Sequence, residues 1–282
     1  MAKGLFERTI KSTSLGRGLW RLVVNLDHHH AGSVANSMAF DAFLSLIPLL
    51  ALAGWVLDRL HRQSGDTLLL ALLKGAPDPI QKLADTEFLR LSEGGLAALP
   101  PISLVAFMWV CSSGLSTAIG EFEVIFHAPP RGYWSRRAIA IGSVVASLAL
   151  YSLVTIATLF VASALGPAGA KVIAVALPAL VSVLVVVAFF RIAVRRPGAI
   201  RRRVWPGALV TVVLWTLLSG GFSLYVSTLS RYVTLYGGLA TVAILLFWLW
   251  LLSLALLIGG EVNAQLEGVR DDDPPSIAIP PG

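Results

Sequence analysis

The chain has 282 residues, of which 56% are hydrophobic and only 13% are charged. A soluble domain carries roughly 25% charged residues, and a soluble chain of this length has no room to bury so much apolar surface. The composition also excludes a disordered chain and a coiled coil, and the single cysteine, Cys111, excludes a disulfide-stapled secreted domain. The sequence therefore predicts an integral membrane protein.

Apolar runs long enough to cross a bilayer, about 18 residues or more, recur six times along the chain. The run from 138 to 190 is too long for one helix, and Gly166-Pro167 divides it into a tight hairpin. The fold class we expect is all-α, a polytopic membrane protein with a six-helix transmembrane domain over residues 34–263. Its spans are expected at about 34–57, 96–120, 138–165, 171–191, 204–230 and 238–261.

Three segments lie outside the predicted spans. Residues 1–33 are expected to form an N-terminal cytoplasmic segment that contains an amphipathic helix, because Leu15, Leu19 and Leu26 follow helical spacing. The loop 58–95 is expected on the outer face, with a second amphipathic helix over 79–93. The tail 264–282 shows no apolar periodicity and is expected to be disordered and cytoplasmic.

The distribution of basic residues predicts the orientation of the chain. Most of the 22 Lys and Arg residues fall in the N-terminal segment and in the loops that follow the second and fourth spans. Cytoplasmic loops carry this excess, so both termini are expected in the cytoplasm. The partners we expect are membrane lipids, with anionic headgroups at the arginine-rich loops, and no nucleic acid.

Charged and polar side chains inside the predicted spans are candidates for function, because their burial in hydrocarbon is costly. Asp41 lies within the first span and shares a helical face with Ser45. Two interpretations of Asp41 stay open: a water-accessible site for a proton, cation or headgroup, and a salt bridge near the boundary of the membrane. The residues predicted to bind substrate or to line its pathway are Asp41, Ser45, Tyr225, Glu261 and Asn263.

Rows of small polar residues follow helical spacing on other spans, and they allow two interpretations. They line a polar pathway, or they let helices pack closely through hydrogen bonds. The rows are Ser112-Ser116-Gly120, Ser143-Ser147-Tyr151-Thr155 and Thr211-Trp215-Ser219-Ser223. Helix-breaking residues in the spans also allow two interpretations: they mark broken helices of the kind that transporters use at binding sites, or they are ordinary in membrane helices. They are Pro48, Pro100-Pro101, Pro178, Pro206 and Gly220-Gly221.

The sequence shows no catalytic constellation. The only histidine cluster is Asp27-His28-His29-His30, and adjacent residues on a helix point about 100° apart, which does not suit one metal ion. No phosphate-binding loop and no zinc-ligand spacing is present. We therefore expect no enzyme activity, no catalytic residue, no metal and no cofactor.

Several motifs together resemble the YihY/BrkB family of bacterial inner-membrane proteins, once mislabelled as ribonuclease BN. They are Leu44–Leu49, Arg131–Arg137, Trp205–Ala208, Phe222–Val226, Tyr236–Ala240, Trp248–Trp250 and Gly259–Ala264. The resemblance covers about residues 30–268, and Asp41 departs from it where the family commonly has an aromatic residue. It implies a cell-envelope protein that handles lipid or an amphipathic solute; the dispersed acidic residues do not support a nuclease.

The expected function is translocation or exposure of a lipid-like or small amphipathic substrate, without ATP hydrolysis by the protein itself. The alternative is a non-transporting structural or regulatory membrane protein that acts through its outer-face loop.

Overall fold

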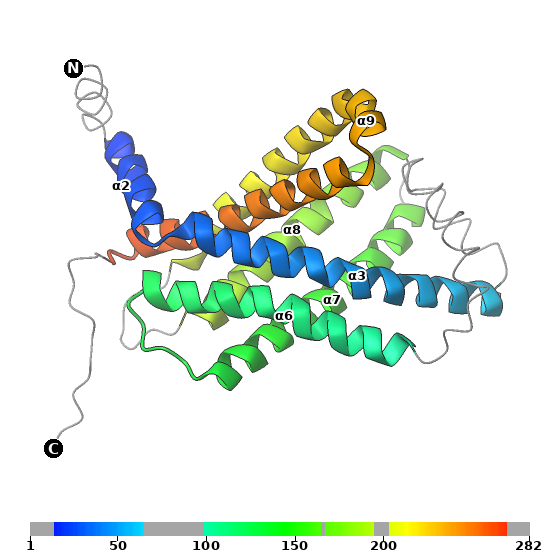
Figure 1. The fold of residues 1–282 in the computed structure, drawn as a ribbon, viewed down its shortest axis with the longest axis horizontal. Coiled ribbons are helices and arrows are strands. Elements are labelled where there is room, and N and C mark those ends of the chain that lie inside the picture. Colours follow the sequence, from blue (N-terminus) through cyan, green and yellow to red (C-terminus); the bar gives the residue numbers. More distant parts are fainter. Residues whose placement is uncertain (1–13, 65–98, 165–166, 195–202, 270–282) are drawn as a thin grey trace. The chain divides into compact units, whose positions relative to one another are not determined.

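The computed structural model describes residues 14–64, 99–164, 167–194 and 203–269, and within these segments the regular structure is entirely helical (Figure 1). The helices are α2 (Ser14–His28), α3 (Ala31–Ser64), α6 (Leu99–Ile125), α7 (Tyr133–Ala164), α8 (Pro167–Ala193) and α9 (Val204–Leu266).

Six stretches of these helices are long and apolar enough to cross a membrane, which confirms the predicted all-α class and number of spans. They are Ala31–Leu52, Ile102–Ile125, Tyr133–Thr158, Val172–Ala193, Val204–Tyr225 and Val242–Leu266.

The helix boundaries refine the predicted spans. Pro167 begins α8, as expected of a residue that lacks a backbone N–H and fits the first turn of a helix. Helix α9 runs to Leu266, and Ala264 is buried, so the packed domain continues past its predicted end at residue 263. The predicted N-terminal helix is α2. The predicted helix over 79–93 lies outside the described residues.

At Pro48, Pro178 and Gly220-Gly221 the helices are continuous. Helix α3 continues through Pro48 and α8 continues through Pro178. Helical structure in α9 likewise includes Gly220 and Gly221. A single missing N–H is tolerated in a membrane helix when neighbouring backbone and side-chain groups satisfy the carbonyl that it leaves. These positions therefore give no evidence of a discontinuous helix at a binding site.

The chain forms two compact units. One comprises Met1–Phe40 and Ser112–Gly282, and the other comprises Asp41–Cys111. The first unit contains α2, the start of α3, the end of α6 and all of α7, α8 and α9. The hydrophobic core and the polar groups described below, apart from Asp41 and Ser45, belong to this first unit.

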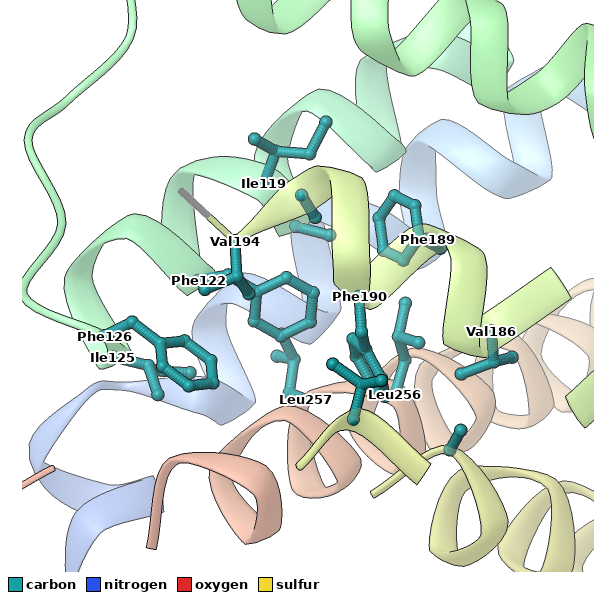
Figure 2. Packing of buried hydrophobic residues seen from close by; sticks show 14 of the residues in the cluster. Ile119, Phe122, Ile125, Phe126, Val186, Phe189, Phe190, Val194, Leu256 and Leu257 are labelled. Atoms are coloured by element: carbon teal, nitrogen blue, oxygen red, sulfur yellow. The ribbon is translucent and has the colours of Figure 1, made fainter. Parts of the chain in front are cut away.

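The core of this unit centres on an aromatic contact between α6 and α8. Phe122 is fully buried, and its ring packs edge-on against Phe190 with the centroids 5.4 Å apart (Figure 2). Phe189 makes a second edge contact with Phe122 at 6.1 Å. Leu256 and Leu257 of α9 belong to the same cluster. Edge-to-face rings are favoured by their quadrupoles, so this contact defines the packing of the helices.

Helix α9 contains two spans that run antiparallel, and Figure 1 shows the ribbon folding back on itself. The indole N–H of Trp215 donates to the carbonyl of Leu252 at 2.8 Å. Further along, Gly207 and Gly259 bring their backbones together, with no space for a side-chain carbon on either residue. Small residues at a membrane helix interface permit such close approach.

Candidate functional site

The most deeply buried ionisable group that the sequence predicted as functional is Glu261, which has 1% exposure. Its Oε1 accepts a hydrogen bond from the side-chain amide of Asn25 at 2.6 Å. Its Oε2 lies 3.4 Å from Nδ1 of His29, which is itself 5% exposed. The end of α2 and the turn that follows it therefore hold a carboxylate near the carboxyl end of α9.

A tight turn positions His29. Residues 29 and 30 join α2 to α3, and His30 adopts a left-handed backbone conformation with φ of 52°. That conformation is uncommon for residues other than glycine. The reversal allows α2 to leave the line of α3, as Figure 1 shows, and to pack on α9. It places Asn25 and His29 beside Glu261.

A second carboxylate, Glu121 of α6, completes the group. It lies within electrostatic range of His29, His30 and Glu261, and it is half-buried. Its Oε1 is buried and makes no hydrogen bond with any described residue. We call Asn25, His29, Glu121 and Glu261 the α2–α6–α9 cluster.

The electrostatic interactions in this cluster are strong because water is largely excluded. Two opposite charges 4 Å apart attract by about 4 kcal/mol at an effective dielectric constant near 20, against about 1 kcal/mol in water. Two carboxylates that face a single imidazole also repel each other. The charge of each group in the cluster therefore affects the others.

A separate ionic group lies around Glu123, which is 4% exposed. Nε of Arg131 and Nη1 of Arg136 each lie 3.9 Å from its carboxylate oxygens. Arg131 also donates from Nη1 to the carbonyl of Ala193 at 2.7 Å and from Nη2 to that of Ile192 at 3.1 Å. It thus satisfies the last carbonyls of α8, where a positive charge is favourable. This arrangement links α6, α7 and α8.

The role of Arg131 is testable by substitution. Arg131→Gln is expected to lower the free energy of unfolding by about 1–2 kcal/mol, because the last carbonyls of α8 lose charged donors. Arg21→Gln removes the same charge from an exposed position on α2 and is expected to have little effect. Thermal unfolding of both purified variants in detergent measures the difference. Equal midpoints would contradict the proposed role.

Asn263 is also buried, and its side chain hydrogen-bonds to backbone groups. Its Oδ1 accepts the N–H of Gly207 at 2.8 Å, and its Nδ2 donates to the carbonyl of Val204 at 3.3 Å. Both contacts join the two ends of α9. The structure therefore gives Asn263 a clear role in closing the hairpin.

The other predicted site residues are not brought into the cluster. Tyr225 is half-exposed at the far end of its span. Asp41 and Ser45 belong to the second compact unit, where the Ser45 hydroxyl donates to the carbonyl of Ala42 at 2.6 Å. Asp41 is partly buried in α3.

Several members of the polar rows make hydrogen bonds, mostly within their own helix and in one case to a neighbouring helix. Ser143 and Ser147 each donate to the carbonyl four residues earlier, at 2.8 and 2.7 Å. Tyr151 shares a hydrogen bond of 2.8 Å with Ser182 of α8, and Thr211 donates to Gly207 at 2.9 Å. These contacts favour the packing interpretation of the rows.

Sequence reasoning missed the partners of Glu261. No sequence pattern distinguishes Asn25, and the histidine run allows either metal ligands or an interfacial location. Among the described residues, no group of three His, Cys, Asp or Glu side chains is placed to hold a metal ion. The available signal was the position of a histidine run directly before the first span, on the side of the membrane where Glu261 ends the last span.

The chain matches the family model described as "Virulence factor BrkB" over residues 22–278, which include every residue of the α2–α6–α9 cluster. The chain belongs to the BrkB family. This agrees with the resemblance seen in its motifs and with a multi-pass membrane protein.

Curated relatives of this BrkB-family chain carry the name UPF0761 membrane protein. Examples come from Xanthomonas campestris pv. campestris strain B100, Xanthomonas axonopodis pv. citri strain 306 and Xanthomonas oryzae pv. oryzae strain PXO99A. Each is 23% identical over 96% of this chain. The chain spans 65% of the length of these relatives. No solved structure matches it.

Proposed function

We propose that this BrkB-family protein translocates or exposes a lipid-like or small amphipathic molecule at the inner membrane of a bacterium, without hydrolysing ATP itself. The observation that carries the proposal is the burial of Glu261 at 1% exposure, as the only charged residue of the span Val242–Leu266, in contact with Asn25 and His29. An ionisable group at such a position is costly and marks a functional site by default.

The chemistry of the cluster suits the polar part of an amphipathic molecule. Carboxylate, imidazole and amide groups meet in the cluster, and the helices of the protein also present surfaces of large apolar side chains. Leu209, Val213 and Leu217 of α9 form one such surface, because they follow one another at helical spacing and are about half-exposed. A headgroup has polar partners here while its chain stays in hydrocarbon.

Translocation is measured directly after reconstitution. The purified protein is placed in liposomes that contain fluorescent phospholipids, and the outer leaflet is bleached with dithionite. We expect the wild-type protein to speed loss of protected fluorescence at least several-fold over empty liposomes, and Glu261→Gln to remove most of that gain. Glu267→Gln is the matched control at the end of α9, since an amide oxygen still accepts the N–H of Arg203. Wild-type rates equal to those of empty liposomes, across lipids of different headgroup, would contradict the proposal.

The second candidate is a non-transporting structural or regulatory membrane protein. The observation that favours it is the hydrogen bonding of the polar rows, in which Ser143, Ser147 and Thr211 bind backbone carbonyls. The outer-face loop through which this candidate acts lies largely outside the described residues. Wild-type translocation no faster than in empty liposomes, together with an envelope phenotype in cells that lack the protein, would favour this candidate.

A further inference from the structure

We infer that His29, Glu121 and Glu261 form a proton-binding site, and that uptake and release of this proton drive or gate the translocation proposed above. The existence of the site is independent of that proposed function, whereas its coupling role rests on it.

The first step in the argument is the arrangement of acceptors. Oε2 of Glu261 makes no hydrogen bond with any described residue, although it is buried, and it faces Nδ1 of His29 at 3.4 Å. Buried carboxylate oxygens are rarely left in this state. A proton held between these two atoms supplies the missing donor. The hydrogen bond from Asn25 holds the other oxygen, so the carboxylate stays oriented toward the imidazole.

The second step is the balance of charge. The groups that face this pair are Glu121 from α6, His30 from the turn, and Asn25 from α2, which is neutral. Arg131 and Arg136, the cations described nearby, lie against Glu123. The electrostatic neighbours of Glu121 are thus two histidines and a second carboxylate. Such a group changes charge when a single proton binds, because the histidine side chain titrates near neutral pH.

The third step is access to water. His28 is exposed, and its ring contacts that of His29 with the centroids 5.4 Å apart. Glu121 is half-buried, whereas Glu261 is fully enclosed. The site thus has outer groups at the surface of the protein and an inner carboxylate that is enclosed. A proton that binds from water reaches Glu261 through these outer groups. It leaves on the same side of the membrane unless the helices move.

The proton site is tested on the full chain in lipid nanodiscs, without any transport assay. The protein has five histidines, so nitrogen-15 labelling gives few imidazole signals, and His29→Gln identifies the signal of His29. We expect Glu261→Gln to move the titration midpoint of His29 to lower pH by about one unit or more, because a nearby anion no longer favours the imidazolium. Glu267→Gln is expected to leave it unchanged. An unchanged midpoint in folded Glu261→Gln protein, as judged by gel filtration, would overturn the inference.

The coupling is tested separately in liposomes. A pH difference across the membrane is expected to change the wild-type rate of lipid translocation several-fold and to leave the rate of Glu261→Gln unaffected. A midpoint shift in a protein that does not translocate lipid would preserve the proton site and reject the proposed function. A wild-type translocation rate that does not change with the pH difference would contradict the coupling.

Discussion

Gly259→Ala is expected to destabilise the protein by about 3 kcal/mol, at the upper end of what overpacking of a core costs. A methyl group on this residue overlaps the Thr211 hydroxyl and the carbonyl of Gly207. Gly207→Ala is expected to act similarly, because its methyl group overlaps the carbonyl of Gly259. Backbone atoms cannot rotate away as a flexible side chain does, so the two spans of α9 must separate.

Gly220→Ala is the matched control, because it lies in the same helix and has no atom near the added carbon. Its expected effect is small and, if anything, stabilising, since alanine favours helix over glycine by about 1 kcal/mol. Unfolding of the three variants in rising concentrations of SDS, followed by tryptophan fluorescence, measures the difference. Similar midpoints for Gly259→Ala and Gly220→Ala would show that the spans do not touch at these glycines.

The fold class and the number of spans were predictable because hydrocarbon imposes a simple length requirement on apolar helices. The run from residue 96 to 120 and helix α6 differ by only a few residues at each end. The same reasoning left two interpretations open at Pro48 and Pro178, because a proline that ends a helix in water is tolerated in a membrane helix whose neighbours satisfy the freed carbonyl. In these spans the helix continues.

The candidate site was predictable only in part. The cost of burying a charge singled out Glu261 directly from the sequence. Its partner Asn25 lies 236 residues away along the chain, and no periodic pattern connects them. Asn263 shows the limit of the same argument, because it satisfies backbone groups at Val204 and Gly207. Burial alone does not distinguish these two roles.

Phe122→Ala is expected to cost about 3–4 kcal/mol, because truncation of a fully buried aromatic side chain leaves a cavity. The lost contacts are those with Phe189 and Phe190, and the ring also packs against Gly260 of α9. The effect should therefore loosen α6, α8 and α9 together. Thermal unfolding in detergent and in nanodiscs measures it, and Phe122→Leu, which keeps most of the volume, is expected to recover more than half of the loss.

Phe40→Ala separates packing from hydrophobicity. Phe40 is 56% exposed, and the same atoms are removed as in Phe122→Ala. In a soluble protein, burial of a ring stabilises the fold because the ring leaves water. In a bilayer, lipid chains are as apolar as the ring, so moving it from lipid into protein gains little free energy. Phe40→Ala is accordingly expected to change stability by less than about 1 kcal/mol in nanodiscs. A loss as large as that of Phe122→Ala would show that Phe40 is covered by protein and does not face lipid. A small loss at both positions would show instead that the aromatic contact between α6 and α8 does not hold the helices together.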